Sequence, residues 1–222
     1  MVSSSAELSN LCLAAQSIRA DLSNYWRHLG VPPGNRAPDI DRIVDSLPVM
    51  LAQHGHSYHA RVARDIADAG YCAAKKTRFH GVRLHMVAQR ACGRLPKPAQ
   101  VWLCEASHHD SKAFIGQSPE VPETNLFGDL AYPTPEIIAH LKEQRTQLIT
   151  PHKKPKGADL TPEEKYYNRL VRKFRQPIES LFNWIQEKTQ IQRASKVPST
   201  DALLVHCWGK LAVAFFLLVF YY

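Results

Sequence analysis

Residues 40–50 read IDRIVDSLPVM, and this stretch sets the interpretation of the rest of the chain. An apolar β-branched pair, Ile43 and Val44, precedes Asp45, and Pro48 follows three residues later. Branched residues favour strands, and proline interrupts the hydrogen bonding of a sheet interior. We therefore expect a strand over 40–50 that Pro48 closes, with Asp45 near its end. An aspartate at a strand end is commonly a turn or cap residue, so this stretch alone does not define a site.

Two further acidic residues stand in settings that complete a chemical pattern. Asp129 follows an apolar run in residues 126–132 (LFGDLAY), and Glu179 lies in a helix-like stretch, residues 175–182 (RQPIESLF). Two strand-end aspartates and one helix glutamate can hold divalent metal against a phosphodiester, because magnesium prefers oxygen ligands and takes only a few carboxylates. The acidic residues that compete for the first and last places are Asp39, Asp41, Asp65, Asp68, Glu164 and Glu187.

The order of four segments extends the pattern along most of the chain. They are residues 43–48 (IVDSLP), a basic stretch over 70–85, residues 107–112 (SHHDSK) with 126–132 after them, and residues 175–184. Together these segments resemble the DDE transposases of bacterial insertion sequences. The resemblance runs from about residue 41 to the C-terminus. It implies an α/β fold: a ribonuclease-H-like mixed sheet flanked by helices, here with a short N-terminal helical segment.

The resemblance also implies roles for the acidic residues. Asp45, Asp129 and Glu179 would be the catalytic residues and the metal ligands, with two Mg²⁺ or Mn²⁺ ions as cofactors and Asp45 bridging them. The implied activity is metal-dependent DNA cleavage and strand transfer. The implied partners are DNA, as terminal inverted repeats and target, and a second copy of the chain in a homodimer on paired ends.

Some features depart from the family pattern. Arg172 and Gln186 stand where some relatives carry Tyr and Lys, and Pro177 falls two residues before Glu179, where it either kinks the helix or marks its first turn. Only 44 residues precede Asp45, which is short for a region that recognises the element's ends. Two alternatives therefore stay open: a truncated, inactive DNA-binding remnant, and a related metal-dependent nuclease that cuts without joining.

The basic residues favour a polyanionic partner. The net charge is +8 and the isoelectric point is about 9.3, and neutralised phosphates dominate the affinity of proteins for DNA. Trp184 is expected to pack in the core, with stacking on a flipped base as the alternative. The residues expected to contact the DNA backbone are Lys75, Lys76, Arg83, Lys153, Lys154, Arg172, Arg175 and Lys188.

Composition indicates a cytoplasmic protein. The five cysteines show no CxxC spacing, which fits a reducing compartment, and the N-terminus lacks the charge and apolar core of a signal peptide. The apolar run at residues 211–222 is too short to span a bilayer and predicts a buried helix, so no membrane is expected.

Local signals predict the remaining elements. We expect an N-terminal helical segment within 1–35, a linker near 31–40, and a catalytic domain over 40–222. Thr134 and Thr161 precede helix starts with proline at the first position, Ser107 or Asp110 caps a short helix, and Gly70 is a break. The further strands are expected over 82–89, 101–105, 125–129 and 147–150.

Overall fold

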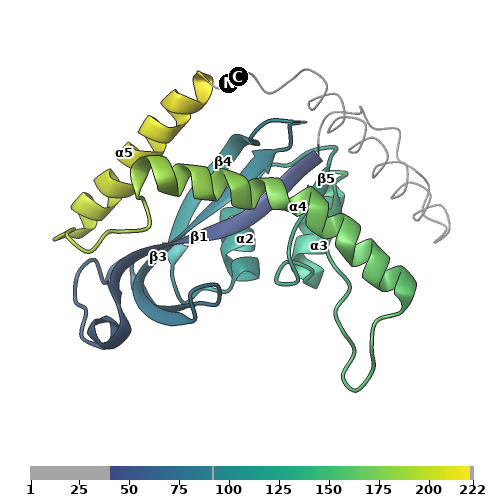
Figure 1. The fold of residues 1–222 in the computed structure, drawn as a ribbon, viewed down its shortest axis with the longest axis horizontal. Coiled ribbons are helices and arrows are strands. Elements are labelled where there is room, and N and C mark those ends of the chain that lie inside the picture. The colour runs from purple at the N-terminus through teal and green to yellow at the C-terminus, as the bar shows by residue number, and fades with distance from the viewer. Residues whose placement is uncertain (1–40, 92, 221–222) are drawn as a thin grey trace.

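The computed structural model describes residues 41–91 and 93–220, so the expected N-terminal helical segment and its boundary lie outside the described residues. Within them, strands, helices and one 3₁₀ turn alternate along the chain (Figure 1). The elements are β1 (Asp41–Gln53), η1 (His54–Tyr58), β2 (Asp68–Cys72), β3 (Thr77–Gln89), β4 (Lys97–Glu105), α2 (Asp110–Gln117), β5 (Asn125–Phe127), α3 (Pro135–Glu143), β6 (Gln147–Ile149), α4 (Pro162–Thr189) and α5 (Thr200–Val219).

The strands form one mixed sheet. Its order is β2–β3–β1–β5–β6, and β4 also pairs with β3. The outer edge of β3 is shared, because its residues 77–81 pair with β2 and its residues 82–89 pair with β4. β1 is antiparallel to β3 but parallel to β5, which in turn is parallel to β6. This α/β arrangement confirms the expected mixed sheet and is consistent with a ribonuclease-H-like fold.

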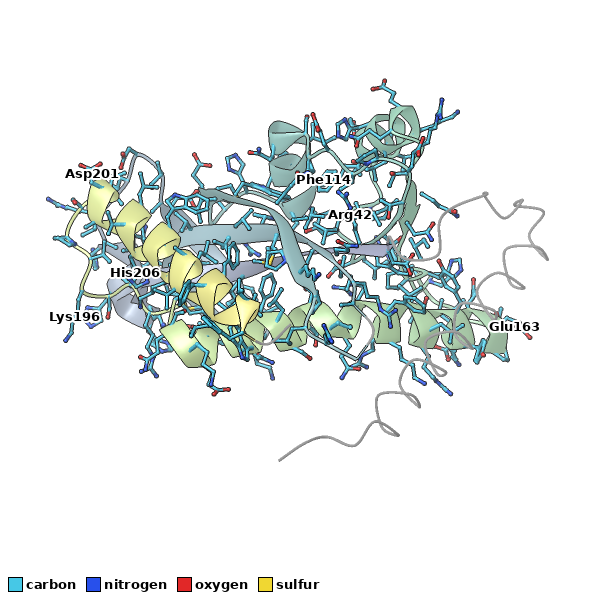
Figure 2. All side chains as sticks on the ribbon, turned by 90° about the horizontal axis from the view of Figure 1, so that it is seen from above. Arg42, Phe114, Glu163, Lys196, Asp201 and His206 are labelled. Atoms are coloured by element: carbon cyan, nitrogen blue, oxygen red, sulfur yellow. The ribbon has the colours of Figure 1, made fainter. Side chains whose placement is uncertain are left out.

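Helices cover both faces of the sheet. α4 and α5 lie on one face, while α2 and α3 lie on the other, as the position of Phe114 shows in Figure 2. Successive strand residues point to opposite faces, so Ile43 packs with the α4 and α5 core and Val44 packs with the α2 and α3 core. The alternation therefore directs Asp45 towards α4 and Ser46 towards α2.

The strand predictions are confirmed in existence and corrected in length. β1 extends to Gln53, so Asp45 lies inside the strand and Pro48 does not close it. The parallel pairing of β1 with β5 stops at Ile43, and beyond it β1 pairs with β3 and, through a single bridge at Met50, with Arg193. A proline is tolerated where one side of a strand is open. The early end of β5 therefore opens the edge of the sheet beside Asp45.

The predicted break at Gly70 is wrong, because this glycine lies inside β2. A side chain at this position would collide with Ala106 at the end of β4, where the nearest atom would be 2.6 Å away. Glycine is used in strands where another backbone approaches closely. Gly70 therefore fixes β2 tightly against β4.

The helix starts were predicted more accurately. The side chain of Thr134 accepts the Ile137 amide, and Thr161 forms a capping box with Glu164, as expected. The cap of α2 is His109, not Ser107 or Asp110. Pro177 lies inside α4, which runs unbroken to Thr189, so the interpretation of Pro177 as a helix start is wrong.

The C-terminal apolar run forms part of a longer helix than the sequence predicted. α5 begins at Thr200 and packs one face against α4, which is side by side with it in both views. Its buried residues are Leu203, Cys207, Leu211, Ala214 and Leu218. The helix is long and apolar enough to cross a membrane by length and composition alone, with a mean hydropathy of 2.0 over a window that is 28% buried.

Candidate active site

Asp45 lies at the open edge of the sheet, and its surroundings shift its pKa strongly. Its Oδ1 accepts the backbone N–H of Ser46 at 2.8 Å, and its Oδ2 lies 3.5 Å from Nη2 of Arg175 on α4. Burial raises the pKa of Asp45 to about 6, against the opposing effects of Arg175 and the Ser46 amide, with smaller upward contributions from Asp129 and Asp110. A half-buried carboxylate that lies near other acids and is balanced by an arginine is typical of a functional site.

Asp129 comes two residues after β5 ends, at the same edge of the sheet as Asp45. Its Oδ1 accepts the backbone N–H of Ala131 at 2.7 Å, which is the ordinary role of a turn aspartate. Asp129 also lines the same cleft as Asp45 and contributes to raising its pKa. The structure therefore brings the first two predicted carboxylates together.

These carboxylates lie in a cleft of about 870 Å³. Its walls come from β1, η1, β2 and the β2–β3 turn, β3, the segment between β4 and α2, and the loop after β5. The lining residues are Asp45, Ser46, Pro48, Ser57, Tyr58, Ala69, Gly70, Tyr71, Cys72, Ala73, Ala74, Arg78, Arg83, Ala106, Ser107, His108, His109, Asp110 and Asp129.

Glu179 occupies a different position. It is exposed on α4 and is not among the residues that line the cleft. In an α-helix the fourth residue on lies one turn along and about 40° around, so Glu179 is the next residue after Arg175 on the side of α4 that meets Asp45. Arg175 pairs with Asp45 rather than with Glu179. Within the described parts of the chain, no three His, Cys, Asp or Glu side chains are placed to hold a metal ion. The histidines that lie close together in the sequence at positions 54, 56 and 59 therefore form no such site.

The rival acidic residues have structural partners. Asp41 accepts the side chain of Asn125, Asp65 accepts that of Thr200, and Asp68 accepts the Ser107 amide. Asp39 lies outside the described residues. The remaining rivals are Glu164, which forms the capping box of α4, and Glu187, which pairs with Lys188.

The sequence argument missed Asp110, at the start of α2. Its Oδ1 accepts the Ser46 hydroxyl at 3.1 Å, and it lies 3.6 Å from Nη1 of Arg83 and 3.9 Å from Nε2 of His85. Burial lowers the pKa of His85 to about 4, against the upward effect of Asp110, which indicates a neutral imidazole. Residues 107–112 had been recognised as part of the family resemblance, but nothing local assigned Asp110 a place beside Asp45.

The predicted DNA contacts are dispersed. Arg83 and Arg175 lie beside the carboxylates. Lys75 and Lys76 occupy the β2–β3 turn, and Lys75 donates to Gln192. The other four lie on α4 or in the loop before it. Lys153 and Lys154 are in that loop, Arg172 is on the exposed side of the helix, and Lys188 is near its end, paired with Glu187.

A basic stripe on α4 was also missed. Lys165, Arg169, Arg172 and Lys173 are all exposed, and their spacing of four, three and one residues puts them on one side of the helix. Only Arg172 was expected to contact DNA. The spacing of these basic residues at the helical period could have predicted the stripe from the sequence. Glu179 lies on the same side of the helix.

The chemistry of this donor set suits a divalent cation. Three carboxylates, those of Asp45, Asp110 and Asp129, line one cleft, and a guanidinium already compensates the charge of Asp45. The Tyr132 hydroxyl is fully buried and has no hydrogen-bond partner among the described residues. Burial, with the charges of Asp110, Asp45 and Asp129, raises its pKa, so it stays a neutral donor. Excess buried negative charge is stabilised by a hard cation with oxygen ligands.

Comparison with known proteins gives one result. Residues 36–215 match the transposase DDE domain, which covers most of the chain. Curated proteins and solved structures give no match. The matched region contains the three aspartates of the cleft and all of α4, and its sheet has the expected mixed topology. The chain therefore belongs to the transposase DDE domain family, a family of catalytic, DNA-binding proteins that generally use divalent metals.

Proposed function

We propose that this chain is an insertion-sequence transposase that cleaves DNA and joins the freed 3′ end to target DNA. The observation that carries the proposal is that Asp45 and Asp129 line one cleft at the open edge of β1, inside a region that matches the transposase DDE domain. Both carboxylates would hold the divalent ions. Bound Mg²⁺ or Mn²⁺ supplies activation of the attacking oxygen and stabilisation of the leaving oxygen.

Glu179 would complete the ligand set from α4. Its side chain is exposed and sits one helical turn from Arg175, whose guanidinium reaches Asp45. Arg175, which lies beside Asp45, would bind a phosphate of the DNA strand in the cleft. A guanidinium binds phosphate oxygens through a pair of parallel hydrogen bonds, so it would orient the scissile group.

The basic stripe of α4 (Lys165, Arg169, Arg172 and Lys173) would position the duplex. Contacts of this kind fix the register of a protein on DNA without reading its sequence. Arg83 was expected to contact the DNA backbone, but its guanidinium already donates to the carbonyls of Ala106 and Tyr71 and lies against Asp110. Its role would be to hold the cleft wall.

A cleavage assay tests the proposal. The purified full-length chain is incubated with magnesium and duplexes that carry the element's terminal repeats. Asp45→Asn, Asp129→Asn and Glu179→Gln should each abolish cutting and leave DNA binding intact, since each change keeps the side-chain volume and removes one charge. Glu187→Gln, on the same helix but paired with Lys188, is the matched control and should cut normally. Normal cutting by any of the first three variants would remove that residue from the site.

A second function is favoured by one observation, the exposure of Glu179 outside the cleft. A chain that never brings this residue to the aspartates would bind DNA without cutting it. The same assay separates the possibilities: strand transfer supports the transposase, nicking without joining indicates a related nuclease, and binding alone indicates an inactive remnant.

Two further aspects of the proposal concern the setting of the reaction. We place the protein in the cytoplasm, on chromosomal DNA, and the three described cysteines, Cys72, Cys104 and Cys207, are free thiols in keeping with a reducing compartment. We also propose a homodimer on paired DNA ends. Light scattering with and without terminal-repeat DNA tests the second point, and a monomer on two joined ends would contradict it.

A further inference from the structure

The outer part of the cleft carries an aromatic and basic surface that the carboxylate chemistry does not use. Tyr58 at the end of η1 and Tyr71 on β2 are 67% and 53% exposed, and both line the cleft that contains Asp45 and Asp129. Among the residues that the structure describes, neither ring has an aromatic or hydrogen-bonding partner. Large rings left open to solvent beside a charged cleft indicate a binding surface.

A cation accompanies the rings. Arg78 lines the same cleft, is exposed, and is the direct cross-strand partner of Tyr71 in the β2–β3 hairpin. Directly opposite residues of an antiparallel pair lie on one face of the sheet with their Cβ atoms about 5 Å apart. An aromatic residue and a basic residue therefore occupy neighbouring positions on one face of the hairpin, where a base and its phosphate could be bound together.

The backbone under this surface is held in place. Nη2 of Arg83 donates to the carbonyl of Tyr71 at 3.0 Å, and its Nε donates to the carbonyl of Ala106 at 3.1 Å. Gly70, the neighbour of Tyr71, allows β2 to approach Ala106 closely. Such fixing lowers the entropy cost of binding, because the ring is already near its bound position.

We infer that Tyr58, Tyr71 and Arg78 form a stacking platform for unpaired nucleotides, next to the carboxylates that would cut the strand. A base can stack on a tyrosine ring only when one of its own faces is free, so the ligand is a single-stranded or frayed DNA end. A cleft of about 870 Å³ lies in the range of sites that hold small ligands, so it has room for unpaired nucleotides. Trp184, the aromatic residue first considered for stacking, instead packs against the core.

This inference rests on the proposed function for the presence of DNA in the cleft, and binding alone tests it. The probe is a duplex with a short unpaired 3′ tail that contains 2-aminopurine, compared with the same duplex without a tail, in EDTA so that no cutting occurs. Stacking on a ring quenches 2-aminopurine fluorescence, and titration gives the affinity of each DNA.

Tyr58→Ala and Tyr71→Ala should each weaken binding of the tailed DNA by roughly 5- to 150-fold and remove the quenching, while blunt-duplex binding stays unchanged. Tyr71→Trp should restore both signals, because any aromatic face stacks. Arg78→Gln should lower the salt dependence of tail binding by about 0.7 in log–log slope. Tyr166→Ala is the matched control, because this tyrosine is 45% exposed on α4 and lies outside the cleft.

Wild-type affinity for the tailed DNA in both tyrosine-to-alanine variants would overturn the inference, and so would an equal loss for tailed and blunt DNA. Unchanged urea midpoints in the variants exclude unfolding as the cause of a loss, and Tyr71→Trp provides a second reading if Tyr71→Ala is unstable. Failure of the proposed function gives a different result: no cutting with magnesium, but tail binding that still depends on the two tyrosines.

Discussion

Replacing Asp45 with asparagine should stabilise the metal-free protein while it abolishes the proposed activity. The pKa of Asp45 is about 6 in the folded chain against an ordinary value of 3.8, and one pKa unit corresponds to about 1.36 kcal/mol. The ionised carboxylate therefore destabilises the fold by about 3 kcal/mol. This is an upper value, because the side chain is 23% exposed.

The direction of the pKa shift of Asp45 decides how its contribution to stability changes with pH. A raised pKa means that the folded state holds the proton more tightly than the unfolded state does. The contribution of Asp45 to stability is complete below about pH 4 and is lost as the pH rises through about 6. Asparagine imitates the neutral acid at every pH, so the advantage of Asp45→Asn should reach about 2–3 kcal/mol at pH 7.5 and fall below about 1 kcal/mol at pH 4.

Urea unfolding of both proteins at the two pH values, in EDTA, measures this difference. Glu179→Gln is the control for loss of an exposed charge and should change stability by less than about 0.5 kcal/mol. Added Mn²⁺ should then stabilise the wild type and not Asp45→Asn, because only a state that binds the ion gains from it. Equal stability of wild type and Asp45→Asn at pH 7.5 would show that the ionised Asp45 side chain does not destabilise the fold. A gain in the free energy of unfolding that is the same at both pH values would show the same.

Two more predictions concern single contacts. Arg175→Gln removes the positive charge that lowers the pKa of Asp45. A carboxyl NMR titration of the metal-free protein should therefore show this pKa rising from about 6 to above roughly 7. An unchanged or lower pKa would show that the ion pair does not form in solution. Gly81→Ala would place a methyl group against the Val49 carbonyl oxygen inside the β1–β3 pair and should destabilise the fold by about 3 kcal/mol or more, measured by urea unfolding. Gly55→Ala, where the new methyl group meets no atom within 4 Å, is its control, and similar losses in both would contradict the packing argument.

Signals confined to a few neighbouring residues were sufficient for much of the fold. The caps at Thr134 and Thr161 were predicted because a hydroxyl, a proline and, for α4, a glutamate act within one turn. The strand around Ile43 and Val44 was predicted from its branched residues. The extent of that strand was not, because proline is acceptable at Pro48 only where β5 has already ended, and this depends on pairing between distant segments.

The same limit explains what was missed in the site. The contact between Arg175 and Asp45 joins residues that are far apart in the chain, and an i,i+4 pair between Arg175 and Glu179 was the nearest local alternative. The position of Asp110 depends on how α2 packs against β1 and β3. The aromatic surface of Tyr71 arises only when β2 folds beside β3. Sequence reasoning identified the acidic residues, and only the tertiary structure gave their partners.

The position of Mn²⁺ in crystals of the protein bound to a DNA end tests the central claim most directly, because anomalous scattering locates the ions without assumption. We expect ions that share Asp45, with Asp129 on one side and Glu179 turned inward from α4 on the other, at oxygen distances of about 2 Å. Ions bound without Asp45, or a full coordination shell around them while Glu179 still points to solvent, would contradict it.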